Sequence, residues 1–462
     1  MKATFLRLAC LVALLGVNGQ AHAQPGTLET TFNALLNVGA QVYAVALQTN
    51  GQIIIGGSFT SIAGTSIKNV ARLNQNGSLD LTFNPMTAAD YGFISALVVQ
   101  PDGKILIGGS FASTTGAAPS NLARLNTNGT ADASFDINLS IDNAVNALCL
   151  QSDGGILFGG AFEFVDGFFR RSVARLYPNG TLDSSFDACV ASGSGSGATA
   201  LTLVSADQIL MSGAFAFSTG SYRDGVARLN PNGDLDATYA PIPGVDPSGS
   251  AYSLISRSDG KALLGGYFST FHSVANRGLV QLTTSGVPDP PFVVGTGINV
   301  AGTNFAMSLQ PDGKVIVGGD FTNYNATTRF RVARINLNGS LDPIFDPGLG
   351  ANDAISAFAI QGDGKILVVG KFTTFNGVSR IGIARLKGDP KSRLDSPTRL
   401  GNGQFQFLFS GDDQIPYAIQ ASSNLVNWIS ITNFTSSTNA VTILDTNAAS
   451  YSRRFYRAVY PP

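Results

Sequence analysis

The residue types that most often carry catalysis or bind metals are scarce in this sequence. After the first 23 residues, the 462-residue chain has one histidine, His272, and two cysteines, Cys149 and Cys189. Histidine acid–base chemistry, a Ser-His nucleophile and a His/Cys metal site each need several such residues in one place. We therefore expect no catalytic residue, no metal site and no cofactor. Calcium (Ca2+) stays open because its ligands are oxygens, but no D-x-D-x-D-G loop supports it.

Aspartate is the remaining residue type that could do chemistry. Glycoside hydrolysis needs two carboxylates at a set separation, and this chain has many aspartates but only two glutamates, Glu29 and Glu163. Ten of the 28 aspartates recur at two positions of an internal repeat, five in D-G turns and five eight residues after an arginine. Recurrence from repeat to repeat indicates a structural role, because a single active site would break the pattern.

The N-terminal residues have the features of a signal peptide. Lys2 and Arg7 precede an apolar run over residues 8–17, and Ala21-His22-Ala23 provides a small-residue cleavage site. The apolar run is too short to span a bilayer, and no later segment has 18 uninterrupted apolar residues. We expect cleavage near Ala23 and an exported protein without a transmembrane segment, either secreted or held in the periplasm or at the cell surface.

Export would permit a disulfide between Cys149 and Cys189. Cys149, however, stands where the first repeat has the small residue Ala46, which favours a buried free thiol. The formal net charge of −1 and the 13% of charged residues give no electrostatic reason to expect nucleic acid as a partner.

Seven copies of one unit follow the N-terminal segment. Each contains an apolar run that ends in a phenylalanine, which we call the core phenylalanine, and successive copies are 51–53 residues apart. These residues are Phe59, Phe111, Phe162, Phe215, Phe268, Phe321 and Phe372. Thirteen residues later stands an arginine, replaced by Gln281 in the fifth copy, and in the first six copies a second aromatic follows at position 24. Length varies only after this second aromatic.

Each unit has the pattern of four short strands. In the first unit residues 42–48 and 52–59 are joined by one tight turn, and residues 70–74 and 79–83 by another. Four strands at a period of about 50 residues are typical of a propeller blade. We therefore expect an all-β fold, with a seven-bladed β-propeller of four-stranded blades over residues 24–389.

The seventh unit lacks a fourth strand, and residues 27–33 match the fourth strand of the first unit, residues 78–84. An N-terminal strand that completes the last blade would close the ring and leave no open sheet edge. In this register an arginine lies opposite an acidic residue across the third and fourth strands. The predicted pairs are Arg72–Asp80, Arg124–Asp132, Arg175–Asp183, Arg228–Asp236, Arg334–Asp342 and, across the closure, Arg385–Glu29.

The repeated Q-x-D-G-K and A-R-L-x-x-N-G-x-L-D-x-x-F segments resemble the bacterial delta-60 repeat, over about residues 27–388. Residues 100–104 and 310–314 are close matches. The resemblance implies an extracellular or cell-surface propeller and implies no reaction. The fourth and fifth copies depart from it at residues 204–207 and 285–288, where we expect looser turns.

Residues 390–462 lie beyond the repeat. Alternating runs such as 404–409 and 417–421, and the closing segment Arg454-Phe455-Tyr456-Arg457-Ala458, resemble a small C-terminal β-sandwich, fibronectin-III-like in size, found in secreted proteins of some bacteria. We expect Trp428, the only tryptophan, to pack in its core.

The long connection after the second strand and the variable connection after the fourth share one rim, and function prefers loops on a rigid scaffold. Departures from the repeat on that rim are the candidate ligand-binding residues, with packing between blades as the alternative for several of them. They are Phe168, Phe169, Arg170, Arg171, Tyr222, Phe271, Tyr324 and Phe330, together with Tyr91.

The leading hypothesis is an exported, monomeric, non-enzymatic binding protein with a polysaccharide or protein ligand at the cell surface. One alternative is a secreted carbohydrate-active hydrolase or lyase that uses aspartates, and another is a purely structural surface protein without a ligand pocket. Converging carboxylates with raised pKa in the axial pocket would favour the enzyme, whereas a lining of small and aromatic residues would argue against it.

Overall fold

A computed structural model describes residues 24–85, 92–111, 121–135, 139–188, 190–193, 197–217, 220–239, 244–246, 249–299, 305–412, 415–437 and 440–460. Two compact units result, Pro25–Gly388 and the residues from Asp389 onward, and each is described by itself. Apart from 3-10 turns at Ser205–Asp207 and Ala448–Ser450, the regular structure of the described residues is β-sheet.

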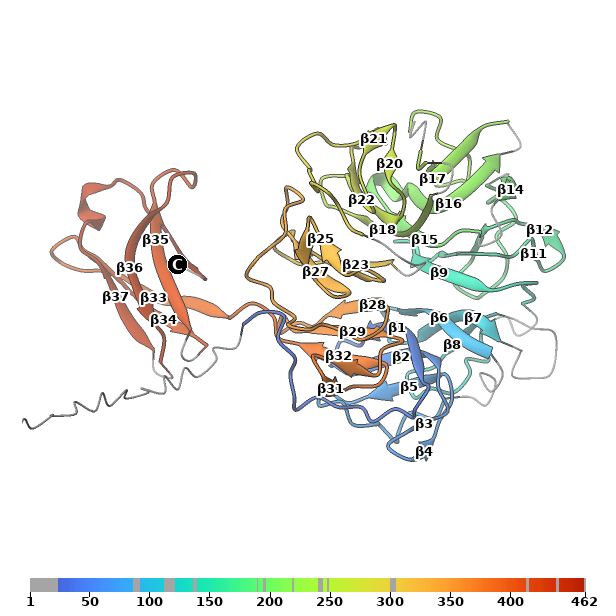
Figure 1. Ribbon diagram of the computed structural model, residues 1–462, viewed down its shortest axis with the longest axis horizontal. Coiled ribbons are helices and arrows are strands. Elements are labelled where there is room, and N and C mark those ends of the chain that lie inside the picture. Colours follow the sequence, from blue (N-terminus) through green and yellow to red (C-terminus); the bar gives the residue numbers. More distant parts are fainter. Residues whose placement is uncertain are drawn as a thin grey trace, which may run out of the picture. The chain divides into compact units, whose positions relative to one another are not determined.

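In the described residues of the first unit, each of the seven repeats contributes one antiparallel sheet of three or four strands (Figure 1). The inner strands are β1 (Gln41–Leu47), β6 (Gly92–Val99), β9 (Val145–Leu150), β15 (Ala200–Leu203), β18 (Ser250–Ser256), β23 (Phe305–Leu309) and β28 (Ile355–Ile360). The middle strands are β2 (Ile53–Ser58), β7 (Ile105–Phe111), β10 (Ile156–Gly160), β16 (Ile209–Phe217), β19 (Ala262–Tyr267), β24 (Val315–Gly319) and β29 (Ile366–Gly370). The outer strands are β5 (Val70–Leu73), β8 (Leu122–Leu125), β13 (Val173–Leu176), β17 (Tyr222–Leu229), β22 (Leu279–Leu282), β27 (Val332–Ile335) and β32 (Ile383–Leu386). β14 (Val190–Gly193) adds a further strand beside β16.

The predicted fourth strand is reduced to a single bridge in every repeat, so the expectation of four regular strands per blade is wrong. In the first repeat the bridge joins Leu73 and Leu79. Gly77, at φ 92°, closes the preceding three-residue loop, in which Asn74 N donates to Ser78 O at 2.8 Å. The strand ends at once because Asp80 Oδ1 accepts from Thr82 N at 2.9 Å, and this local turn competes with the ladder.

The fourth and fifth repeats keep the hairpin hydrogen bonds despite their different turn residues. Val204 N donates to Gln208 O at 2.9 Å, with Asp207 at φ 56° where most other repeats have glycine. Thr283 N donates to Val287 O at 2.8 Å. These turns are therefore as closed as the others.

In five repeats the described residues between the middle and outer strands form short hairpins. They are β3–β4 (Ser61–Ile62, Thr65–Ser66), β11–β12 (Phe164–Val165, Phe168–Phe169), β20–β21 (Thr270–Phe271, Val274–Ala275), β25–β26 (Asn323–Tyr324, Thr327–Thr328) and β30–β31 (Thr374–Phe375, Val378–Ser379). The connection that enters each inner strand bridges to this hairpin, as Leu36 does to Ile62. Both long connections therefore share one rim, which we call the hairpin rim.

Neighbouring sheets pack face to face around a common centre (Figure 1). Each inner strand contacts the next one along the chain, and β28 of the last repeat contacts β1 of the first. One apolar cluster joins Phe32 and Ile55 to Leu367 and Val369 of the seventh repeat. Leu28 bridges to Leu386 of β32, and Glu29 N donates to Arg385 O at 2.8 Å. The N-terminal segment thus pairs with the outer strand of the last repeat.

The second unit has two three-stranded antiparallel sheets. One has the order β33 (Ser392–Arg399), β34 (Phe405–Gly411), β37 (Val441–Asp445), and the other the order β36 (Ile429–Thr435), β35 (Pro416–Ser422), β38 (Phe455–Val459). Phe407, Tyr417 and Ile443 from both sheets share one apolar cluster. Trp428 lies outside this buried cluster: it is partly exposed and the guanidinium of Arg457 lies 4.1 Å from the centre of its ring, so the expectation of core packing is wrong.

Candidate functional site

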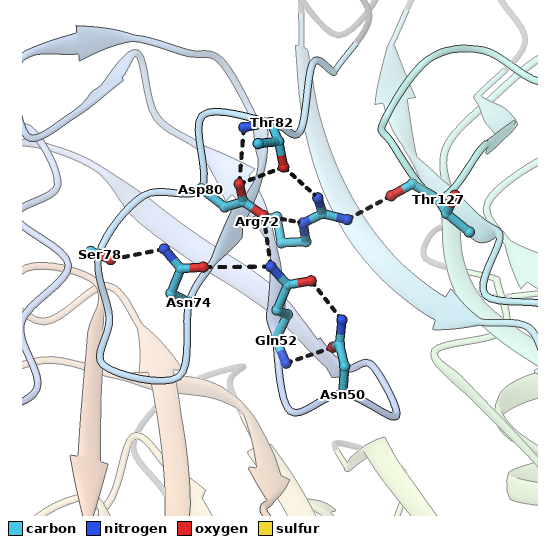
Figure 2. Close-up of polar contacts among 8 residues, drawn as sticks. All are labelled: Asn50, Gln52, Arg72, Asn74, Ser78, Asp80, Thr82 and Thr127. Carbon is cyan, nitrogen blue, oxygen red and sulfur yellow. Dashed lines mark hydrogen bonds and ion pairs between the residues drawn. The ribbon is translucent and has the colours of Figure 1, made fainter.

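A side-chain cluster centred on one carboxylate recurs at the outer edge of the sheets (Figure 2). In the first repeat Arg72 Nε donates to Asp80 Oδ2 at 2.7 Å, and Gln52 Nε2 donates to the same oxygen at 2.7 Å. The hydroxyl of Thr82 donates to Asp80 Oδ1 at 2.7 Å. The structure brings the other predicted pairs together in the same way, with Nε to carboxylate distances of 2.6–2.8 Å: Arg124–Asp132, Arg175–Asp183, Arg228–Asp236, Arg334–Asp342 and Arg385–Glu29.

The same arginine also reaches the next repeat. Arg72 Nη1 donates to the backbone oxygen of Thr127 in the second repeat at 2.6 Å. Corresponding bonds run from Arg124 to Pro178, from Arg175 to Pro231 and from Arg228 to Thr284, at 2.5–2.6 Å. Arg385 of the last repeat donates to Gln75 O of the first. We call this guanidinium the arginine bridge, because it joins the carboxylate of one repeat to the backbone of the next.

These carboxylates have lowered pKa values. Burial by itself raises the pKa of Asp80, but the hydrogen bonds from Thr82 and Arg72 outweigh burial and lower the pKa to about 2. The pKa values of Asp132, Asp183, Asp236, Asp289, Asp342 and Glu29 are lowered in the same sense. A carboxylate with a lowered pKa stays ionised near neutral pH, so it cannot donate a proton as a general acid.

The fifth repeat has no arginine bridge. Gln281 replaces the arginine and donates to Asp289 Oδ2 at 2.6 Å, and Lys261 Nζ donates to the same oxygen at 2.8 Å. Arg257 stands where the neighbouring sixth repeat has Gln310, so arginine and glutamine have exchanged places in this repeat. The charge of Arg257 helps to lower the pKa of Asp289, but its Nε and Nη2 atoms are buried without a hydrogen-bond partner among the described residues.

A cavity of about 330 Å³ lies between the inner strands. Seven of its lining residues occupy one repeat position, sixteen residues before the core phenylalanine, and Phe93 is the eighth. The seven are Tyr43, Ser95, Asn146, Thr199, Tyr252, Phe305 and Ser356. This position lies near the start of the inner strand, so the cavity is at the end of the strands that is nearer the hairpin rim.

Among the described residues that line this cavity, none has a charged side chain. Three of its hydroxyl groups donate their hydrogens within the protein. Ser95 Oγ donates to Val145 O at 2.7 Å, Thr199 Oγ1 to Ala251 O at 2.8 Å, and Tyr43 OH to Gln41 Oε1 at 2.6 Å. These oxygens therefore offer only lone pairs to a ligand. A cavity of this kind can bind a polar molecule, but the described part of its lining provides no carboxylate or imidazole with which to transfer a proton.

A family model described as "Domain of unknown function (DUF5122) beta-propeller" matches the chain seven times, at residues 48–83, 100–135, 151–186, 207–239, 257–292, 310–345 and 361–389. These matches cover more than half of the chain. The chain belongs to this β-propeller family. A comparison with curated proteins finds no match.

Three solved structures are similar to this propeller at low scores. Two are of a polysaccharide lyase titled PL25 ulvan lyase. One, bound to -[GlcA(1-4)Rha3S]-, has a TM-score of 0.35 and 10% identity, and the other has a TM-score of 0.38 and 12% identity. Both matches cover 79% of this chain and 95% of the other. The third, titled glycoside hydrolase, has a TM-score of 0.23 and 12% identity, and covers 94% and 96%. At these scores the similarity says nothing about what this propeller binds.

The structure brings three of the predicted rim residues together in the third repeat of the propeller. Arg170 Nη1 donates to Phe169 O at 2.8 Å, and the Arg171 guanidinium lies 5.4 Å from the centre of the Phe169 ring. Phe168 and Phe169 are 57% and 45% exposed. Arg171 is paired with Glu163 at 2.7 Å. Of the others, Tyr222 is exposed at the start of β17, Phe330 is half-buried in the sixth repeat, and Tyr91 lies outside the described residues.

Phe271 and Tyr324 are core residues, so their assignment as candidate ligand-binding residues is wrong and the alternative, packing between blades, holds for both. Both are fully buried and belong to apolar clusters between neighbouring sheets. Each stands three residues after a core phenylalanine, and the equivalent residues Ile62, Val165 and Phe375 are also fully buried. The position faces inward because it pairs with the entering connection, as Val245 does with Phe271.

The residues with catalytic potential are scattered. His272 lies in the two-residue turn of the β20–β21 hairpin, and Cys149 is a partly buried free thiol whose pKa burial raises. Cys189 lies outside the described residues. Within the described ranges, no three His, Cys, Asp or Glu side chains gather as a metal site would require. None of the helices in the same ranges is long and apolar enough to cross a membrane.

Sequence reasoning missed the cavity residues, although an internal signal for them exists. At the neighbouring positions of the first repeat, Val42 and Ala44 are buried and apolar, and most other repeats also have apolar residues there. The position between them holds Tyr, Ser, Asn, Thr, Tyr, Phe and Ser in the seven repeats. The residue type at this position varies, whereas the positions on either side stay apolar in most repeats. Such a position is expected to face away from the apolar core that the repeats share.

Proposed function

We propose that this chain is an exported, non-enzymatic binding protein that holds a small ligand in the axial cavity of its propeller. The observation that carries the proposal is the cavity itself, because its lining position differs from repeat to repeat and contains no charged residue. The scaffold positions on either side stay nearly constant. Variation confined to a concave surface is what a binding site on a repeated scaffold requires.

The finer architecture belongs to the same proposal. We infer a closed, seven-bladed propeller of the delta-60 type over residues 24–389, a signal peptide at residues 1–23, and a fibronectin-III-like β-sandwich over residues 390–462. The closure is supported by the bonds of Arg385 to Glu29 and to Gln75 O. The sandwich is supported by the apolar cluster that the two C-terminal sheets share.

A plugged variant tests the binding site. In Ser356→Tyr a tyrosine would stand at the lining position of the seventh repeat, as Tyr43 does in the first, so the fold already accommodates this residue there. The purified protein is screened by thermal shift and calorimetry against a library of sugars, amino acids, nucleosides and short carboxylic acids. We expect at least one compound to bind, and the plugged variant to lose that binding.

The matched control is Ser379→Tyr, which makes the same change in the same repeat at an exposed hairpin position. It should bind like the unaltered protein. If no compound binds, or if the compounds that bind do so equally well to Ser356→Tyr, the proposal of an axial binding site is overturned.

A further inference from the structure

The lining of the axial cavity is divided into aromatic and polar parts. Tyr252 and Phe305 come from the neighbouring inner strands β18 and β23, which contact each other. Tyr43 and Phe93, from β1 and β6, form a second pair with ring centres 5.8 Å apart at 75°. Ser356 of β28 stands between these two pairs in the order of the repeats. The aromatic rings of the cavity therefore come from the fifth, sixth, first and second repeats, with Ser356 of the seventh repeat between them.

The part of the lining that runs from the second to the fourth repeat is polar. Ser95, Asn146 and Thr199 come from the second, third and fourth repeats. The Ser95 and Thr199 hydroxyls donate to backbone oxygens of the following repeats, at 2.7 Å and 2.8 Å, so they can only accept from a ligand. A ligand that satisfies this side must therefore bring hydrogen-bond donors.

The uncharged side chains of the described lining further limit the class of ligand. A carboxylate or phosphate ligand would need a cation or several hydrogen-bond donors. The described lining residues include no cation, and the hydroxyl groups of Tyr43, Ser95 and Thr199 donate within the protein. This leaves Ser356 Oγ as a buried hydroxyl without a partner among the described residues. An organic cation would find no carboxylate among the described lining residues and would depend on cation–π contacts with the aromatic rings alone. An uncharged molecule with hydroxyl groups avoids both costs.

We infer, on the basis of the proposed function, that the ligand of the axial cavity is a neutral saccharide ring. A pyranose has an apolar face of C–H groups, which would stack on Tyr252 and Phe305, and equatorial hydroxyl groups, which would donate to Ser95 and Thr199. Asn146 has an amide that can both donate and accept, which suits a hydroxyl group that does the same. A saccharide is the ligand class that matches both halves of the lining.

Calorimetry with defined probes tests the ligand class. The probes are methyl glucoside, methyl galactoside, methyl mannoside and gluco-disaccharides, with glucuronate, choline and indole as anionic, cationic and apolar comparisons. We expect at least one neutral saccharide to bind and the three comparison compounds not to bind. Tyr252→Ala and Asn146→Ala should each weaken saccharide binding about tenfold or more, because each removes one half of the recognition. Tyr267→Ala, an exposed tyrosine on the middle strand of the same repeat, should leave it unchanged.

The outcomes separate this inference from the proposal on which it rests. Binding of glucuronate, choline or indole that Ser356→Tyr abolishes would overturn the saccharide assignment and leave the axial binding site standing. Saccharide binding that survives Ser356→Tyr would overturn both. Saccharide binding that Tyr252→Ala leaves unchanged would overturn the stacking arrangement, and circular dichroism shows that each variant is folded.

Discussion

We call the contact between two neighbouring repeats a seam, and two of these seams differ in how they are held together. The seam between the seventh and first repeats joins segments far apart in the sequence, yet it has the full set of contacts. Arg385 binds Glu29 and Gln75 O, and its guanidinium lies 4.5 Å from the centre of the Phe32 ring. The seam between the fifth and sixth repeats is continuous in sequence, but Gln281 replaces its arginine bridge.

The comparison shows what holds neighbouring repeats together. The fifth and sixth repeats follow each other in the chain, so little conformational entropy is lost when they come together. Their contact therefore depends less on an arginine bridge. The seventh and first repeats have no short connection, and their contact depends on side chains and on the pairing of residues 25–32 with β32. The arginine bridge should therefore contribute most to stability at the seam that no short stretch of chain connects.

The largest expected effect comes from removal of the N-terminal segment. Deletion of residues 24–34 removes the partner of β32, Glu29 and the buried Phe32 together. We expect the melting temperature of the propeller to fall by roughly 10 °C or more, because several kcal/mol of burial and ion pairing are lost. Differential scanning calorimetry measures the change.

A peptide of residues 24–34 added in trans provides the control for this deletion. It should restore most of the lost stability, since its contacts need no covalent link. The same peptide with Phe32→Ala should restore much less. An unchanged melting temperature in the deletion variant would show that the N-terminal segment does not hold the seam.

Single substitutions at the two seams should differ in size. Arg385→Ala removes the bonds to Gln75 O and to Glu29. Glu29 is largely buried and keeps Lys365 at 3.3 Å, and the substitution should lower the free energy of unfolding by about 3 kcal/mol. Gln281→Ala removes one hydrogen bond from Asp289, which keeps Lys261, and should cost about 1 kcal/mol. Urea unfolding measures both, and equal losses would contradict the difference between the seams.

Restoring the repeat pattern in the fifth repeat should stabilise it. The double variant Arg257→Gln, Gln281→Arg would place a bridge at the seam and remove a guanidinium whose Nε and Nη2 are buried without partners. We expect a gain of about 1 kcal/mol in the free energy of unfolding. Gln281→Arg alone should gain less, because it places two guanidinium groups near Asp289. The four proteins of this double-mutant cycle are compared by urea unfolding, and additive effects would show that the two positions do not interact.

The scaffold could be predicted from the sequence because the same residue types recur at the same spacing from repeat to repeat. The spacing of Arg72 and Asp80 recurs in most repeats, and Glu29 stands where a seventh acidic residue is needed. The fourth strand could not be predicted as a single bridge, because Leu79–Phe83 has a strand-like pattern and only the local bond of Thr82 to Asp80 interrupts it.

The candidate site was harder to predict because the similarity of the repeats obscures the few residues that differ between them for a functional reason. Phe271 and Tyr324 are large aromatics on a loop, and only comparison with Ile62 and Phe375 shows that this position is core. The cavity residues are small departures inside a strand of otherwise constant pattern. Which side of the strand faces the axis follows from the three-dimensional arrangement of the sheets rather than from any one repeat.

The smallest expected effect is a difference in acid sensitivity between the closing seam and the others. The pKa of Glu29 is lowered from an ordinary value of 4.5, and that of Asp80 from 3.8 to about 2. Each group stabilises the fold fully above its ordinary pKa and loses that contribution as the pH falls through its lowered value. As the pH falls, the contribution of Glu29 should therefore begin to decline near pH 4.5, and that of Asp80 should begin to decline near pH 3.8 and be lost at about pH 2.

Urea midpoints of the unaltered protein, Glu29→Gln and Asp80→Asn between pH 7 and about pH 2 measure these contributions. The difference between Glu29→Gln and the unaltered protein should shrink first, and the difference for Asp80→Asn should shrink only at lower pH. Glu29 is the only glutamate among the acidic residues that pair with the repeat arginines or with Gln281. In Glu29→Asp the stability contribution of this acidic residue should therefore decline at a lower pH. If both differences shrink together, the closing seam is no more sensitive to acid than the seams that use aspartate.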